Sequence, residues 1–158
     1  MDSKIVKSRC ERAIQRLLDH DSFLITNGAD EQSVTFRLAM YLADEFPGLD
    51  VDCEYNRDET DPKRDTERKL IRPDIIVHRR GTQENILVIE AKKPNNPNDD
   101  EKKLQQLTSK EGKLKYRFGV RLVLKTGNCA SITGDLYMGG ELAEENWIQC
   151  RSKRSASS

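Results

Sequence analysis

The stretch Ile86-Leu-Val-Ile-Glu-Ala-Lys92 decides the fold, and it also carries two charges. Side chains alternate between the two faces of a strand, so Val88, Glu90 and Lys92 share one face. A run this apolar is typical of a central strand that is covered on both sides. A carboxylate and an ammonium on such a strand are costly to bury unless something pairs with them. A bound divalent cation, with a phosphate beside the lysine, would provide that pairing.

A second carboxylate lies in the apolar run before this stretch, within a strand predicted over residues 70–78. Asp74 follows Pro73, a residue that is tolerated at the start or edge of a strand, and it precedes Glu90 by 16 positions. If a short turn makes the two strands neighbours, both carboxylates can converge at one end of the sheet. Together with the backbone carbonyl of Ala91 they would form a hard oxygen site suited to Mg²⁺ or Mn²⁺.

Hydrophobic periodicity and turn signals assign the remaining elements. We predict an α/β domain, with one mixed central sheet flanked by helices and the core order αβββαβ. The first three strands form a meander, and a helix crosses to the fourth. The predicted helices span residues 3–19, 31–46 and 99–111, and the predicted strands span 49–55, 70–78, 85–92, 119–125, 130–137 and a short segment near Trp147.

The chain length fits one domain, and the composition excludes several classes of function. We assign residues 1–150 to a single domain with its core at about 30–125, a polar loop to 56–69 and a disordered tail to 151–158. No apolar run is long enough to span a bilayer, and residues 1–11 lack the apolar block of a secretory signal, so a cytoplasmic protein is expected. The four cysteines include no C-x-x-C pair, so neither a zinc site nor a disulfide framework is indicated.

Charge is unevenly placed along the chain although its net value is zero. Residues 1–62 carry 7 basic and 14 acidic side chains, whereas residues 63–125 carry 17 basic and 9 acidic ones. A local basic region is what phosphate binding needs, although a solvated surface has the same composition. The candidate contacts to nucleic acid are Lys63, Arg64, Arg68, Lys69, Arg72 and Lys93.

The pattern Pro73-Asp74 followed by Glu90-Ala91-Lys92 resembles the signature of the PD-(D/E)xK nuclease superfamily, which has the restriction-endonuclease-like fold. The resemblance covers roughly residues 30–125, because the same order of helix, three strands, helix and strand forms the core of that family. It implies that Asp74 and Glu90 hold the metal. It also implies that Lys92 orients or activates the attacking water and stabilises the developing charge.

Two further site residues follow from this resemblance. The family often adds an acidic residue from the preceding helix, and Glu31 is the matching candidate because it shares a stripe with Val34 and Leu38. The segment EAKKP, followed by a helix with Gln105 and Gln106, is similar to the nuclease domains of restriction-enzyme cleavage subunits. In that branch a helix glutamine assists the site, and Gln105 is favoured over Gln106.

Each of these residues also has a purely structural interpretation. Asp74 can bond backbone amides at the start of a strand, and Glu90 with Lys92 can form an exposed ion pair worth under ~1 kcal/mol. Glu31 can stabilise the dipole of its own helix. His20 and His78 are interpreted as ordinary surface or loop residues, with His78 kept as a remote candidate.

The sequence therefore predicts a Mg²⁺- or Mn²⁺-dependent phosphodiesterase that acts on nucleic acid, with DNA favoured over RNA and endonuclease action favoured over exonuclease action. A homodimer is one expectation, since many related enzymes need two copies to cut two strands. The alternative is a nuclease-like module without activity that binds nucleic acid or a partner protein. A third interpretation is an unrelated α/β domain whose resemblance is accidental.

Overall fold

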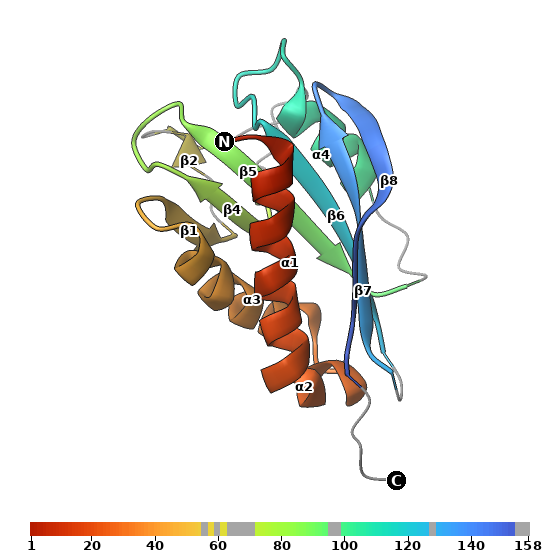
Figure 1. Ribbon diagram of the computed structural model, residues 1–158. Helices are drawn as coiled ribbons and strands as arrows, with labels where there is room; N and C mark the ends of the chain where they lie inside the picture. The colour runs from red at the N-terminus through yellow and green to blue at the C-terminus, as the bar shows by residue number, and fades with distance from the viewer. Residues whose placement is uncertain (55–56, 59–60, 63–71, 95–98, 127–128, 154–158) are drawn as a thin grey trace, which may run out of the picture.

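A six-stranded mixed sheet forms the centre of the protein (Figure 1). The computed structural model describes residues 1–54, 57–58, 61–62, 72–94, 99–126 and 129–153. Neighbouring strands are antiparallel except for β5 and β6, which run parallel. In spatial order the strands are β1 (Asp50–Cys53), β4 (Ile75–His78), β5 (Asn85–Lys92), β6 (Phe118–Lys125), β7 (Ser131–Met138) and β8 (Glu141–Arg151).

Helices cover both faces of this sheet (Figure 1). On one face, α1 (Ser3–His20) and α3 (Glu31–Glu45) bury their apolar stripes against β4, β5 and β6, and the short α2 (Ser22–Thr26) connects them. On the other face, α4 (Asp100–Thr108) packs against a smaller cluster built on Ile76, Val88 and Tyr137. The predicted class, a mixed α/β domain with a central sheet flanked by helices, is therefore confirmed.

Side-chain caps set the start of the two long helices. The Asp2 carboxylate accepts a hydrogen bond of 2.9 Å from the Ile5 amide, and the Asp30 carboxylate accepts one of 2.7 Å from the Ser33 amide. Such caps satisfy amides that have no partner within the helix. The cap at Asp30 matters for the site, because it fixes Glu31 in the first turn of α3.

Helix α4 lies unusually close to the sheet where it crosses β6. A Cβ atom added at Gly119 would come within 2.8 Å of the Thr108 side chain and 3.3 Å of Leu104. Only glycine permits this close approach of helix and strand. Thr108 also accepts a hydrogen bond of 3.1 Å from the Gly140 amide, so the end of α4 is tied to the turn between β7 and β8.

Several predicted boundaries are wrong. The strand expected over 49–55 is limited to Asp50–Cys53, and the helix expected to reach residue 111 ends at Thr108, because Ser109 has an extended backbone. The last strand is not short: β8 has 11 residues. Its first six side chains are exposed, so backbone pairing with β7 holds this edge strand without an alternating apolar pattern.

Within the loop predicted over 56–69, β2 (Arg57–Asp58) and β3 (Asp61–Pro62) instead pair as a small antiparallel ladder. The rest of that loop and residues 154–158 of the predicted tail lie outside the described residues, whereas Arg151, the first residue of that tail, instead ends β8. All four cysteines are free thiols. Among the described helices, none combines the length and the apolar character required to cross a bilayer.

Candidate functional site

The carboxylate of Asp74 lies against the end of β5. Asp74 directly precedes β4, which pairs with β5 in a register that sets Ile75 opposite Ile89. One oxygen of Asp74, Oδ2, accepts a hydrogen bond of 2.8 Å from the Ala91 amide. The register of two neighbouring strands thus brings the Asp74 carboxylate to the peptide unit that joins Glu90 to Ala91.

Glu90 is buried on the face of the sheet that α4 covers, with 1% of its surface exposed. Its closest charged partner is Lys103 of α4, whose Nζ lies 2.7 Å from Glu90 Oε1. Burial, and then the charge of Asp74, raise the pKa of Glu90 to about 8, although Lys103 acts in the opposite direction. A carboxylate this buried gains from any additional cation that reaches it.

A third carboxylate that the sequence argument left unassigned, Asp100, joins this site from the first turn of α4. Asp100 is buried, with 5% of its surface exposed. Burial raises the pKa of Asp100, as does the nearby Asp74, against the lowering effect of Lys92 and Lys103. Because Asp74 raises the pKa of both Glu90 and Asp100, and Asp100 also raises that of Glu90, the three carboxylates share one electrostatic environment at the end of β5.

Lys92 occupies the end of the same strand, partly exposed to solvent. Its Nζ lies 3.7 Å from Glu31 Oε2, while the other oxygen of Glu31 accepts a hydrogen bond of 3.2 Å from the Lys93 amide. Burial by itself would lower the pKa of Lys92, but the charges of Asp100, Glu31 and the other carboxylates outweigh it and raise the pKa. Lys92 therefore stays an ammonium at neutral pH.

Glu31 faces this end of the sheet, as the stripe shared with Val34 and Leu38 predicts. Through its contacts to Lys92 and Lys93, it ties the start of α3 to the point where β5 ends. The contact with Lys92 makes Glu31 a neighbour of the candidate site. A role in metal binding stays a prediction.

The remaining predicted residues are placed differently. Gln105 is exposed and lines a cavity of about 520 Å³ with Gly139 and Glu141, whereas it is Lys103 that extends from α4 to Glu90. Arg72 is exposed, and Lys93 donates a hydrogen bond of 3.2 Å from Nζ to the Gly28 carbonyl. Four of the predicted nucleic-acid contacts lie outside the described residues: Lys63, Arg64, Arg68 and Lys69.

Lys103 and Asp100 are the two site residues that sequence reasoning missed. A signal for them was present, because Asp100, Lys103, Leu104 and Leu107 follow the spacing of one helix face. Leu104 and Leu107 are both predicted to point inward and are buried. The same stripe therefore carries two charges towards the sheet, which on a buried face is a mark of a functional site.

The donor set at this site has the chemistry that Mg²⁺ or Mn²⁺ requires. Asp74, Glu90 and the carbonyl of Ala91 offer hard oxygen ligands, and each carboxylate has a second oxygen beyond the one bonded to the protein. Within the part of the chain that the structure describes, there is no group of three or more histidine, cysteine, aspartate and glutamate side chains already arranged around one ion position. Two carboxylates supplemented by a backbone oxygen and water remain a suitable set.

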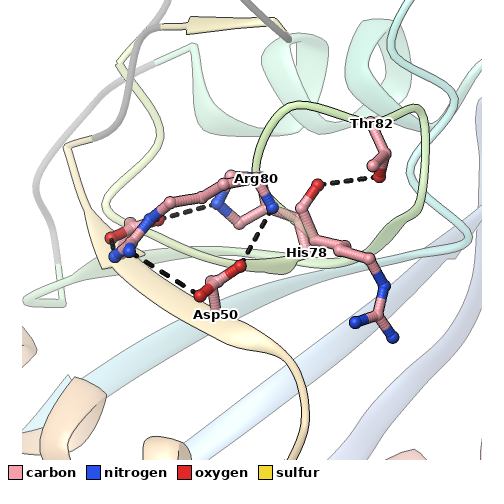
Figure 2. A network of polar contacts seen from close by, with 6 residues as sticks. Asp50, His78, Arg80 and Thr82 are labelled. Carbon is pink, nitrogen blue, oxygen red and sulfur yellow. Dashed lines mark hydrogen bonds and ion pairs between the residues drawn. The ribbon is translucent and has the colours of Figure 1, made fainter.

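The expectation that His78 is an ordinary surface or loop residue is wrong. His78 is 3% exposed, and its Nε2 lies 2.7 Å from Asp52 Oδ2 of the neighbouring strand. Arg80 donates to both oxygens of Asp52, and its amide donates a hydrogen bond of 3.0 Å to Asp50 (Figure 2). The network joins β1 to the turn after β4, so His78 has a structural role here.

Replacing Asp52 with alanine is expected to destabilise the fold by about 2–3 kcal/mol, because the buried ring of His78 loses its partner. Urea unfolding at pH 7 measures this. The control is Asp50→Ala, a more exposed partner of Arg80, for which a loss under ~1 kcal/mol is expected. Equal losses in the two variants would contradict this account.

The effect of Asp52 should also depend on pH. Burial would raise the pKa of Asp52, but hydrogen bonds and charge from Arg80 and His78 outweigh it and lower the pKa below the ordinary 3.8. A carboxyl whose pKa is lowered on folding stabilises the protein above its unfolded pKa, and this contribution is lost as the pH falls through the folded value. The difference between wild type and Asp52→Ala should therefore shrink below pH 3.8.

The geometry of Asp74, Glu90, Lys92 and Asp100 is the basis for any functional assignment. No protein-family model, no curated protein and no solved structure matches this chain.

Proposed function

We propose that this protein is a metal-dependent nuclease that hydrolyses phosphodiester bonds, with DNA as the favoured substrate and endonuclease action as the favoured mode. One observation carries the proposal. The hydrogen bond from the Ala91 amide to Asp74 places one carboxylate at the peptide unit that joins the buried Glu90 to Ala91, one residue before Lys92. Two carboxylates and an ammonium at the end of neighbouring strands are the groups that phosphodiester hydrolysis needs.

The order of elements supports the same proposal. Helix α3 is followed by the antiparallel strands β1, β4 and β5, then by α4, then by β6 parallel to β5. This is the order expected of a restriction-endonuclease-like core, with Asp74 directly before its second strand and Glu90 on its third. The proposed fold family and the proposed chemistry thus rest on the same two strands.

Asp74 and Glu90, with the Ala91 carbonyl, would hold Mg²⁺ or Mn²⁺. When bound, such an ion lowers the pKa of a water ligand and stabilises charge on the phosphate. Lys92, held as an ammonium by its carboxylate neighbours, would face the phosphate and stabilise the negative charge that grows during attack. Its raised pKa favours this role over that of a base that takes a proton from water.

The contacts to nucleic acid are proposed for basic side chains around the site. Arg72 is exposed two positions before Asp74, and Lys93 directly follows Lys92. Cations there can neutralise phosphates that flank the scissile bond, with an affinity that falls as salt increases. A homodimer would let two such sites cut both strands.

The proposal is tested by incubating the purified protein with plasmid, linear duplex and single-stranded DNA, and with RNA, in Mg²⁺, Mn²⁺ or EDTA. Cleavage is expected with either metal and not with EDTA. Asp74→Asn keeps the size and an acceptor for the Ala91 amide but removes the charge, so it should lose activity by at least about 10²-fold.

The matched control is Asp44→Asn, whose exposed carboxylate pairs with Arg16 at the opposite end of α3 and should leave cleavage unchanged. If the wild type bound DNA without cleaving it, the proposed nuclease function would be rejected in favour of a module that only binds nucleic acid. Full activity of Asp74→Asn would rule out the proposed site.

A further inference from the structure

Lys103 is the cation that Glu90 contacts in this structure. It lies on α4, which the glycine at position 119 allows to pack closely against β6. Its Nζ is 2.7 Å from Glu90 Oε1, although Glu90 is 1% exposed and the Lys103 side chain is 28% exposed. The ammonium thus approaches a buried carboxylate from the solvent side of the site.

The same ammonium makes a second contact that reaches the other half of the site. Lys103 Nζ donates a hydrogen bond of 3.1 Å to the Arg72 carbonyl, two residues before Asp74. It therefore bridges the segment that leads into β4 and the end of β5, the two segments that carry the proposed metal ligands. A divalent ion bound by Asp74 and Glu90 would have to bridge these same two segments.

We propose that Lys103 and the catalytic divalent cation compete for Glu90, so that Lys103 acts as a built-in counter-ion that must withdraw before metal can bind. This rests on the proposed function, because it concerns the same metal site. A metal within about 2.1 Å of a Glu90 oxygen and an ammonium at contact distance would repel each other strongly in a buried setting. Lysine can withdraw, since its flexible stem lets the ammonium turn to solvent.

The competition has a physical benefit for the protein. A buried ionised carboxylate without a partner is strongly destabilising, so Glu90 in its ionised form needs a cation whether or not metal is present. Lys103 supplies that cation from a helix that also brings Asp100, a further carboxylate, to the site. Metal affinity is thereby reduced by the strength of the ion pair between Lys103 and Glu90.

The competing explanation is that Lys103 has only a structural role, in which its contact with Glu90 holds α4 against β5. The two explanations differ in what happens to metal binding when Lys103 is removed. A purely structural lysine would cost stability on removal and leave the affinity for metal unchanged or weaker. If Lys103 competes with the metal, its removal would make the affinity for metal tighter.

Calorimetric titration of Mn²⁺ into the wild type and Lys103→Met tests this directly. The variant should bind Mn²⁺ about tenfold more tightly, within the range usual for two coupled binding events. Lys102→Met is the matched control, since Lys102 is the exposed preceding residue of the same helix, and its affinity should equal that of the wild type. An unchanged or weaker affinity in Lys103→Met would overturn the inference.

A second measurement uses the wild type alone, so it does not depend on a variant that folds. Reductive methylation of lysines, followed by mass spectrometry, reports how accessible each ammonium is. Saturating Mn²⁺ should speed the labelling of Lys103 several-fold relative to Lys102, because the ammonium leaves Glu90 and the Arg72 carbonyl. Equal labelling with and without Mn²⁺ would show that Lys103 stays in place, and would overturn the competition.

Neither readout needs cleavage, so the two proposals fail separately. Tighter Mn²⁺ binding by Lys103→Met together with no cleavage of any nucleic acid would support the competition and reject the nuclease. Cleavage by the wild type together with unchanged Mn²⁺ affinity in Lys103→Met would support the nuclease and reject the competition. Absence of Mn²⁺ binding in both proteins would reject the metal site and the competition together.

Discussion

Replacing Glu90 with glutamine is expected to abolish metal-dependent cleavage and, at the same time, to stabilise the folded protein at alkaline pH. The loss of activity follows because glutamine keeps the size but not the charge of a proposed metal ligand. We expect a loss of at least about 10³-fold, as is typical when a group that holds the catalytic charge is removed. Cleavage of plasmid DNA in Mg²⁺ at pH 8 measures it.

The gain in stability follows from the raised pKa of Glu90, about 8 in the folded protein against an ordinary 4.5. Below pH 4.5 the carboxyl is protonated in both folded and unfolded chains, so its charge does not reduce the free energy of unfolding. As the pH rises from 4.5 to 8, the unfolded chain loses its proton first, so the free energy of unfolding decreases. Above pH 8 the full penalty is present, and glutamine avoids it.

We therefore expect Glu90→Gln to exceed the wild type in unfolding free energy by about 1–3 kcal/mol at pH 9, and by little at pH 4. Urea unfolding in EDTA across this pH range is the measurement. Glu84→Gln serves as the control, since the exposed pair of Glu84 with Arg79 predicts little change in either readout. If Glu90→Gln kept its activity, Glu90 would not be a metal ligand. If Glu90→Gln were less stable than the wild type at pH 9, the raised pKa of Glu90 would be contradicted.

Replacing Lys92 with methionine is expected to reduce the rate of cleavage without weakening metal binding. Methionine keeps the length of the apolar stem but removes the ammonium that would stabilise charge at the phosphate. The loss in kcat should be about 10²–10³-fold, the usual effect of removing one group that stabilises the transition state. Because Lys92 is a cation among carboxylates, its removal should leave Mn²⁺ affinity unchanged or tighter.

The comparison of Lys92→Met with Lys92→Arg separates charge from position. Arginine keeps the charge and should recover part of the activity, whereas a lysine that acts as a base would not be replaced by arginine. The dependence of the cleavage rate on pH gives a further check. Because the pKa of Lys92 is raised, no change in rate near neutral pH should arise from deprotonation of Lys92. Activity of Lys92→Met close to that of the wild type would remove Lys92 from the mechanism.

Much of the central sheet can be predicted from local sequence. The continuous apolar run that leads to Glu90 and Lys92 predicts β5, and the structure assigns Asn85–Lys92 to that strand. The helix beginning after Asp30 is predicted from its cap and its stripe, and both are present. These features are local, because caps and periodicity act between residues within one or two turns.

Contacts between distant elements are not encoded in such local patterns. The ion pair of Lys103 with Glu90 depends on how closely α4 crosses the sheet at Gly119, and a sequence pattern contains no such distance. The pair of His78 with Asp52 likewise depends on strand register, across 26 positions of chain. The length of β8 is greater than predicted, because the exposed side chains of its first half follow no apolar alternation.

The sequence by itself thus determined the class of fold and the three charged residues of the proposed site, Asp74, Glu90 and Lys92, since each is visible as a charge that interrupts or ends an apolar run. Only the tertiary structure decided which other groups join them. Strand register brings Asp74 to the Ala91 amide, and the packing of α4 adds Lys103 and Asp100. The physical reason is that burial and pairing of charge depend on distances across the core, which the chain sets only once it has folded.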